Sequence, residues 1–187
     1  MSKTTHIIAI LDRSGSMGSL AVEVVSNFNK FLKEQQALPG KAKLTLAVFD
    51  NEVKVIHDKV NLADVNPITN EYVIGGATAM YDGIGMTLAP LLSKKKAIVL
   101  IHTDGYENSS KEYNKYDVKK MIDSKKKWKF IFVGADINAA DVGTGMGINI
   151  ADTIQTTRSA EDLVGSYNVF SSATMAYRAD NSKEPTA

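Results

Sequence analysis

The sequence contains no cysteine, and this absence excludes a disulfide framework and any metal site built on thiolates. It fits a reducing compartment. No apolar run approaches the length of a membrane span, and the N-terminal segment has neither the long apolar stretch nor the small-residue cleavage site of a secretory signal. We therefore expect a soluble, cytoplasmic protein without a membrane segment.

A charge excess of one sign is also missing, because 22 Lys and Arg residues face 21 Asp and Glu residues, for a formal net charge of +1. This balance gives no general attraction to nucleic acid, so we do not expect a nucleic-acid partner. One local cluster of lysines occurs near the end of a predicted helix, where cations favour the helix dipole. We interpret it as a solvated helix end, with a phosphate-binding patch as the alternative. The lysine cluster consists of Lys119, Lys120, Lys125, Lys126, Lys127 and Lys129.

The chain of 187 residues, 44% apolar and 23% charged, has the length and composition of one globular domain with a sizeable core. We place that domain at residues 1–178. Residues 179–187 are expected to form a flexible C-terminal tail.

Apolar patterns typical of strands and helices alternate along the chain. Ile7 to Leu11 and Ala97 to His102 are continuous apolar runs, typical of buried parallel strands, and helical periodicity follows the first run. The alternation predicts an α/β fold, a doubly wound three-layer sandwich around a mainly parallel sheet. Residues 44–48 and 53–57 alternate around a polar turn, which predicts one antiparallel edge strand. Further on, we expect a strand at 128–133, a brief strand at 148–150 and a final helix that Ser159 and Asp162 open as a capping box.

Short oxygen-bearing side chains follow both buried strands. The first strand leads into Asp12, Ser14 and Ser16, and the second leads into Asp104. Parallel strands place their ligand sites at their carboxyl ends, so these side chains can share one edge of the sheet. Thr78, which follows Gly75-Gly76-Ala77 at the entrance of a predicted helix, can reach the same point.

These five side chains are hard oxygen ligands, which suit a divalent cation such as Mg²⁺. Only Asp12 and Asp104 carry charge, so a carboxylate from outside can still gain by joining the metal. A tight calcium site uses more carboxylates. Each residue alone could instead cap a helix or close an Asx turn, but independent caps have no reason to converge at one sheet edge. We therefore predict one open metal site.

The pattern Asp12-x-Ser14-x-Ser16, with Thr78 after two glycines and Asp104 after an apolar strand, resembles the metal ion-dependent adhesion site (MIDAS) of von Willebrand factor A (vWA) domains. The resemblance extends over roughly residues 5–175. The segment from Gly75 to Ile84 is more similar to the small stand-alone bacterial and phage members than to integrin inserts. The resemblance implies a non-catalytic protein-binding module. Its bound Mg²⁺, or alternatively Mn²⁺ or Ca²⁺, would be completed by an acidic side chain of the partner protein.

An enzyme is the alternative. Asp12 could be the nucleophile of a metal-dependent phosphatase or other hydrolase, with Asp104 holding Mg²⁺. That chemistry expects a second acid two residues after the nucleophile, where this chain has Ser14, and no convincing general base or phosphate-holding lysine follows. We therefore expect no catalysis.

Other polar residues near these strands receive different interpretations. We expect Asp82 to cap its own helix, with hydrogen bonds to waters around the metal as the alternative. We expect His102 to be packed in the core and Asp136 not to be a metal ligand. The loops after the strands should form the rim that selects the partner. The expected rim residues are Arg13, which would pair a second acid, Met17, Ala77, Tyr81 and the segment from Tyr106 to Ser110.

Overall fold

The computed structural model describes residues 4–183 and contains a six-stranded sheet in the order β3-β2-β1-β4-β5-β6. Strand β2 pairs with β1 in parallel and with the edge strand β3 in antiparallel, and β4, β5 and β6 continue the sheet in parallel. The predicted parallel sheet with one antiparallel edge strand is thus confirmed. The strands are β1 (Thr5–Asp12), β2 (Ala42–Phe49), β3 (Val53–Asn61), β4 (Ala97–Thr103), β5 (Lys129–Ala135) and β6 (Thr153–Thr156).

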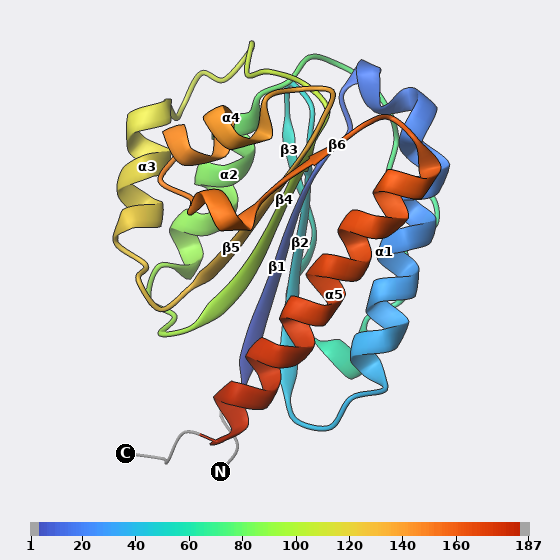
Figure 1. Cartoon of the computed structure of the whole chain (residues 1–187), viewed down its shortest axis with the longest axis vertical. Helices are drawn as coiled ribbons and strands as arrows, with labels where there is room; N and C mark the ends of the chain where they lie inside the picture. Colours follow the sequence, from blue (N-terminus) through green and yellow to red (C-terminus); the bar gives the residue numbers. More distant parts are fainter. Residues whose placement is uncertain (1–3, 184–187) are drawn as a thin grey trace.

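Helices cover both faces of this sheet (Figure 1). Helices α1 (Ala21–Gln36) and α5 (Ala160–Lys183) lie on one face, and α2 (Met80–Leu88), α3 (Lys115–Asp123) and α4 (Ala139–Gly145) lie on the other. The three-layer sandwich expected from the alternation of patterns is therefore present. Short 3₁₀ turns lie between these elements, at Gly15–Leu20, Leu62–Asp64, Ala89–Leu91 and Ile150–Asp152. Among the described helices, none is long and apolar enough to cross a membrane.

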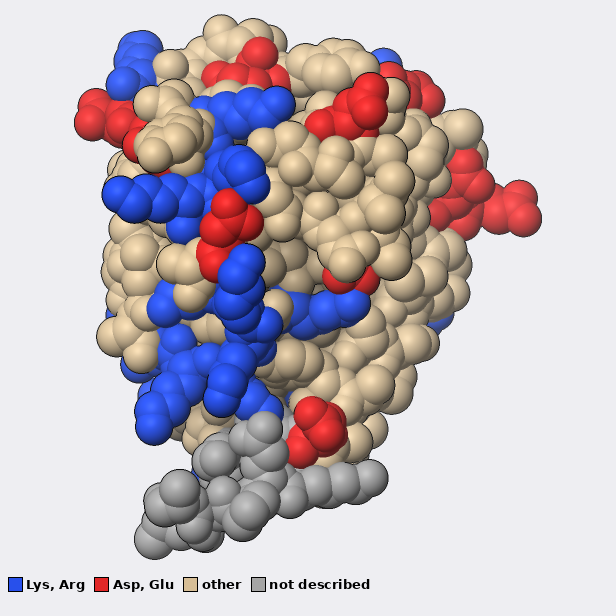
Figure 2. Space-filling model, turned by 60° about the vertical axis from the view of Figure 1, so that its left-hand side comes forward, with Lys and Arg blue, Asp and Glu red and all other residues tan. Residues whose placement is uncertain are grey.

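The lysine cluster lies at the end of α3 and the start of β5. Figure 2 shows basic side chains gathered on the side of the molecule that α3 occupies, with acidic side chains among them. Lys119 pairs with Asp123 at 2.8 Å, and Lys125 lies 5.5 Å from the centre of the Trp128 ring. Lys129 pairs with Asp152. Lys119, Lys125 and Lys129 thus have intramolecular partners, and the interpretation as a solvated helix end stays a prediction.

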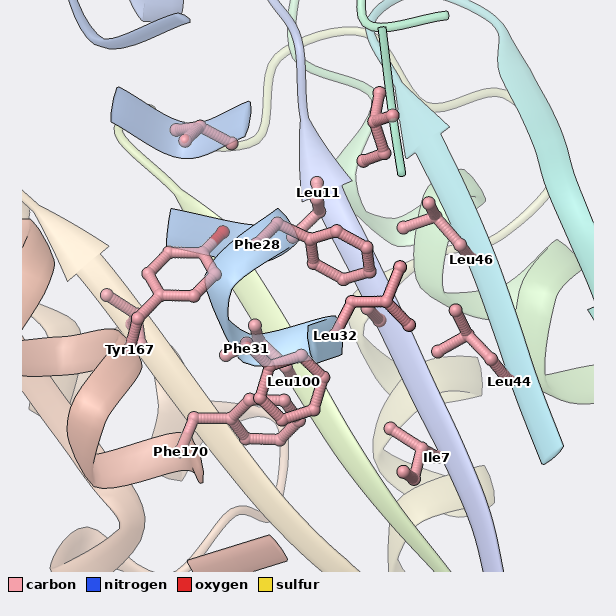
Figure 3. Close-up of a cluster of buried hydrophobic side chains, with 14 of the residues drawn as sticks. Ile7, Leu11, Phe28, Phe31, Leu32, Leu44, Leu46, Leu100, Tyr167 and Phe170 are labelled. Atoms are coloured by element: carbon pink, nitrogen blue, oxygen red, sulfur yellow. The ribbon is translucent and has the colours of Figure 1, made fainter. Parts of the chain in front are cut away.

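The core is divided by the sheet because successive strand residues point to opposite faces. From β1, Ile7 and Leu11 join the cluster beneath α1 and α5 (Figure 3), whereas Ile8 and Ile10 join the cluster beneath α2, α3 and α4. In the first cluster the rings of Phe31 and Phe170 lie 4.7 Å apart between their centroids, where α1 meets α5. Both faces of β1 are buried, which fixes the position of its last residue.

The brief strand predicted at 148–150 is wrong. The sixth strand is β6, which pairs with β5 from Phe132 opposite Thr153 onward. The two isoleucines that suggested a strand have different surroundings. Ile148 is buried in the core cluster on the α4 side of the sheet, whereas Ile150 is 65% exposed in a 3₁₀ turn.

The final helix begins close to the predicted position, but only half of the predicted capping box forms. The Ser159 hydroxyl accepts the Asp162 N–H at 3.1 Å, as expected. The Asp162 carboxylate, however, accepts the N–H and the hydroxyl of Thr157 instead of the Ser159 N–H. The helix continues past the predicted domain boundary at 178 to Lys183. The remainder of the predicted tail, residues 184–187, lies outside the described residues.

Candidate metal centre

Asp12 ends β1 as a fully buried carboxylate. Its Oδ1 accepts the Ser14 N–H at 2.7 Å, and its Oδ2 accepts the Thr103 hydroxyl. The Tyr72 hydroxyl donates to the backbone carbonyl of Asp12. Burial raises the pKa of Asp12, and nearby Asp104 acts in the same direction, while hydrogen bonds from Ser14 and Thr103 lower it. A buried carboxylate in this position gains from a cation.

The two serines connect Asp12 to Asp104. The hydroxyls of Ser14 and Ser16 lie 3.2 Å apart, and Ser16 donates to Oδ1 of Asp104 at 2.6 Å. Neither serine acts as a helix cap: the turn that follows Ser14 and helix α1 both lack a capping hydrogen bond from a side chain. The cap interpretation is therefore wrong for these serines, and their hydroxyls face the carboxylates.

Backbone hydrogen bonds hold the serine loop, which follows β1 and carries Ser14 and Ser16, against the loop that carries Thr78. The Gly15 N–H donates to the Gly76 carbonyl at 3.1 Å, and the Gly75 N–H donates to the Arg13 carbonyl at 3.0 Å. Gly76 has a φ of 70° and lies so close to Asn51 that a Cβ there would be 1.9 Å from the Asn51 Oδ1. Only glycine allows this approach. The serine loop and the Thr78 loop are thus one joined unit.

Thr78 is buried and precedes α2 without capping it. Its N–H donates to the Asn108 side chain at 2.9 Å, and its carbonyl accepts the Asn108 N–H at 3.0 Å. A Cβ added at Gly105 would lie 3.0 Å from the Thr78 hydroxyl oxygen, so this hydroxyl adjoins the residue after Asp104. In the described part of the chain, no hydrogen bond joins the Thr78 hydroxyl to the other four predicted ligands.

Asp104 has a fully buried side chain that faces an arginine not anticipated from the sequence. Nε of Arg158 lies 3.0 Å from Oδ2 of Asp104, and Nη2 donates to the Asp104 carbonyl at 3.4 Å. The first contact is an ion pair without hydrogen-bond geometry, since Oδ2 accepts no hydrogen bond from the described residues. Arg158 also lies 3.7 Å from Oδ2 of Asp136.

This donor set fits a hard divalent cation. It offers two buried carboxylates, one of them with an oxygen that accepts no hydrogen bond, together with neighbouring hydroxyls. No group of three or more His, Cys, Asp or Glu side chains among the described residues is placed to hold a metal. The rest of the shell of a cation here would come from hydroxyl and water oxygens or from a ligand outside the described chain.

Thr103 is a residue of this centre that the sequence reading missed. Its position could have indicated this, because Thr103 follows the apolar run of β4 as Asp12 follows that of β1. The two strands pair in parallel with Leu11 opposite His102, so Asp12 and Thr103 are neighbours. The contact of Arg158 with Asp104 could not be predicted in this way, since Arg158 follows a short polar strand and is part of no recognisable sequence motif.

The prediction that Asp82 caps its own helix is wrong. Its carboxylate accepts the backbone N–H groups of residues 111, 112 and 113 at 2.8, 3.0 and 2.7 Å. The Asp82 N–H in turn donates to Ser110 at 3.0 Å. Asp82 thus fixes the loop after β4, which adjoins Asp104, to the start of α2.

The rim differs from the prediction at two residues. Met17 is fully buried in the core, so it is no part of the rim. Arg13 already pairs with Asp50 at 3.3 Å and is largely buried. Tyr106, by contrast, is 58% exposed, and Ala77 is also exposed. The exposed arginine near the carboxylates is Arg158, whose side chain is 41% exposed.

His102 is packed in the core, as predicted. It is fully buried and meets Tyr167 edge-on, with 5.8 Å between ring centroids. Burial lowers the pKa of His102 to about 4.

Solved structures establish what this fold is. The vWF domain of the type V pili tip protein Mfa5 from Porphyromonas gingivalis superposes with a TM-score of 0.70 at 9% identity, over 100% of this chain and 99% of that one. The PilB minor pilin from Streptococcus sanguinis gives a TM-score of 0.67 at 11% identity, over 96% of this chain and 62% of that one.

Proximal thread matrix protein 1 from the mussel byssus, solved with zinc in its MIDAS motif, gives a TM-score of 0.63 at 17% identity, over 89% of this chain and 47% of that one. This chain therefore spans less than two thirds of both the pilin and the byssus protein. No family model and no curated protein sequence matches it. The likenesses show that the chain has the vWA fold.

Proposed function

We propose that this chain, which has the vWA fold, is a protein-binding module that acts through a divalent cation. Asp12, Ser14, Ser16, Thr78 and Asp104 would hold Mg²⁺, with Mn²⁺ or Ca²⁺ as alternatives, and an acidic side chain of the partner protein would complete the shell. One observation supports this most strongly: two buried carboxylates and two serine hydroxyls from separate strands form one hydrogen-bonded group at the carboxyl edge of the sheet.

The charge of the group supports recognition of an acidic partner. Two carboxylates balance the charge of a divalent cation only formally, and neutral hydroxyls add none, so an outside carboxylate still finds a favourable ligand position. When bound, the cation supplies this Lewis-acidic position. The chain itself supplies the rim, where exposed Tyr106 and Ala77 offer contact area around the centre.

We propose no catalytic role. Both oxygens of Asp12 already accept hydrogen bonds, from the Ser14 N–H and the Thr103 hydroxyl, which is a poor arrangement for a nucleophile. Hydrolysis of p-nitrophenyl phosphate with Mg²⁺ should therefore not exceed that of Asp12→Asn. A metal-dependent rate that this substitution abolishes would favour the hydrolase instead.

Thermal melts with added metal test the centre. We expect Mg²⁺ or Mn²⁺ to stabilise the wild-type chain by roughly 2.7 kcal/mol at a hundred times the dissociation constant. The core does not depend on the ion, so the metal-free chain should remain folded. Asp12→Ala should lose the response, whereas Asp58→Ala, an exposed carboxylate on β3, should keep it. A response that persists in Asp12→Ala would contradict the proposal.

Capture from a native lysate tests the partner. A protein retained in Mg²⁺ should be lost in EDTA and also lost when Asp12→Ala is the bait. Thr78→Ala should weaken metal and partner together, whereas Tyr106→Ala should weaken the partner and leave metal affinity nearly unchanged, because Tyr106 lies outside the proposed ligands. A complex that forms equally well in EDTA would contradict the metal-dependent mode.

A further inference from the structure

Arg158 lies between β6 and α5 and contacts carboxylates from two other strands. Its guanidinium is 3.0 Å from Oδ2 of Asp104, after β4, and 3.7 Å from Oδ2 of Asp136, after β5. The two carboxylates differ in their surroundings, since the Asp104 side chain is fully buried and that of Asp136 is 47% exposed. Arg158 therefore joins a buried carboxylate of the metal centre to an exposed one outside it.

Asp104 needs a positive charge near it. A buried carboxylate is costly unless it is paired, and Asp12 places a second buried carboxylate in the same group. Among the described ion pairs, Arg158 is the cation that meets Asp104. The pair is poorly aligned, because Oδ2 accepts no hydrogen bond from it.

The contacted oxygen is also the Asp104 oxygen that accepts no hydrogen bond, and is therefore the one more open to a cation. Oδ1 of Asp104 is already taken by the Ser16 hydroxyl at 2.6 Å, whereas Oδ2 meets only the guanidinium charge. A divalent cation at this oxygen would repel the guanidinium. Asp136 offers it a second carboxylate less than 4 Å away. Backbone contacts hold Asp136 in place, since its N–H donates to the Thr156 carbonyl at 3.0 Å.

We propose that Arg158 competes with the divalent cation for Asp104 and turns to Asp136 when the cation binds. The inference rests on the proposed function, since it concerns the same site. Arg158 then lowers the metal affinity of the centre. Held by Asp136, its exposed guanidinium can also pair a second acidic group of the partner. The sequence predicted this role for Arg13, but Arg13 forms an ion pair with Asp50.

Titration calorimetry with MnCl₂ and MgCl₂ tests the competition. Arg158→Gln should bind metal about tenfold more tightly, because a positive charge near the ion is removed. Arg158→Lys should bind close to wild type, because it keeps the charge. Lys127→Gln serves as the matched control: it makes the same charge change at an exposed residue before β5, at the opposite end of the sheet, and should leave affinity unchanged.

Two further readouts separate competition from a purely structural role. Without metal, Arg158→Gln should melt at a lower temperature than wild type, because Asp104 loses its partner, although its metal affinity rises. Asp136→Asn should weaken metal binding in the wild-type background, because the displaced arginine loses its second partner. In the Arg158→Gln background the same substitution should have little effect.

The outcomes distinguish the two proposals. Metal binding by wild type with equal or weaker binding by Arg158→Gln would overturn the role of Arg158 and leave the metal centre intact. An Asp136→Asn effect that is undiminished in the Arg158→Gln background would overturn the movement to Asp136. No binding of either metal by any of the variants would overturn the proposed function, and the role of Arg158 with it.

Discussion

Asp82 is the residue outside the proposed ligands on which the rim most depends. Three backbone N–H groups of residues 111–113 converge on its buried carboxylate. Hydrogen bonds to a charged acceptor are stronger than neutral ones, and loss of this carboxylate removes the shared acceptor of three backbone donors. We predict that Asp82→Ala lowers the free energy of unfolding by about 2–4 kcal/mol, measured by urea denaturation.

Exchange of the amide hydrogens locates the effect. The amides of residues 111–113 should lose protection in Asp82→Ala, and Asp82→Asn should show a smaller loss because it keeps one acceptor oxygen. Asp117→Ala is the control, since Asp117 lies in the exposed capping box of α3 with Asn114 and should cost only about 1 kcal/mol. A loss for Asp82→Ala no larger than that of the control would contradict this role.

The residue scale also shows where sequence reasoning succeeds. Asp12 and Asp104 could be placed because each lies at the end of a long apolar run, and burial on both faces of such a strand leaves one position for its end. The position of Met17 could not be predicted. A residue in a loop is expected to be exposed, but the turn from Gly15 to Leu20 directs Met17 into the core. The partners of Asp82 and Arg158 are set by tertiary contacts between distant segments, which no local pattern encodes.

At the scale of the element, α2 lies unusually close to its neighbours because of its glycines. A Cβ at Gly83 would be 2.7 Å from the buried Phe49 ring, and one at Gly85 would be 2.3 Å from Tyr113. Helix propensity alone would disfavour both glycines by about 1 kcal/mol each. Close packing of the helix that follows Thr78 therefore accounts for them.

This close approach reverses the usual effect of a helical Gly→Ala change. We predict that Gly83→Ala destabilises by about 1–3 kcal/mol, because the methyl group meets a ring with no room to move. Gly165→Ala in α5 should instead stabilise by roughly 0.5–1 kcal/mol, since an added Cβ there meets nothing within 4 Å. Thermal melts of the two variants measure the difference, and equal shifts in one direction would contradict the packing argument.

The misplaced sixth strand shows the limit of periodicity for short elements. β6 has the sequence Thr-Ile-Gln-Thr, whose single apolar residue gives no pattern, while Ile148 and Ile150 alternate without forming a strand. Pairing with β5, a nonlocal contact, decides which segment extends the sheet. The long strands β1, β4 and β5 were placed correctly because each contains a continuous apolar run of the length typical of a buried strand.

At the scale of the whole molecule, two uncharged histidines lie inside the sheet core. His6 on β1 is 5% exposed, and its Nε2 has no hydrogen-bond partner among the described residues, and His102 on β4 is fully buried. Burial, together with Lys94, Lys43 and Lys59, lowers the pKa of His6 from 6.5 to about 4. Protonation of these rings in the fold is therefore unfavourable.

The sign of the resulting pH dependence follows from linkage. Below pH 6.5 the unfolded chain binds a proton at His6, whereas the folded chain does so only near pH 4. The folded state should thus lose stability as the pH falls from 6.5 to 4, by up to about 3 kcal/mol for His6, with no further loss from this residue below pH 4. Urea denaturation at pH 7.5, 6, 5 and 4.5 measures the slope.

Comparison of two histidine variants shows which histidine causes the loss of stability at low pH. His6→Gln should flatten the decline between pH 6.5 and 4.5, whatever its effect on stability at neutral pH, because Gln does not titrate. His57→Gln, at a partly exposed position on the edge strand β3, is the matched histidine control. His102, whose pKa burial also lowers to about 4, should contribute to the decline that remains in His6→Gln. If His6→Gln and wild type decline in parallel, His6 accepts its proton without opening the core, and the burial argument fails for this residue.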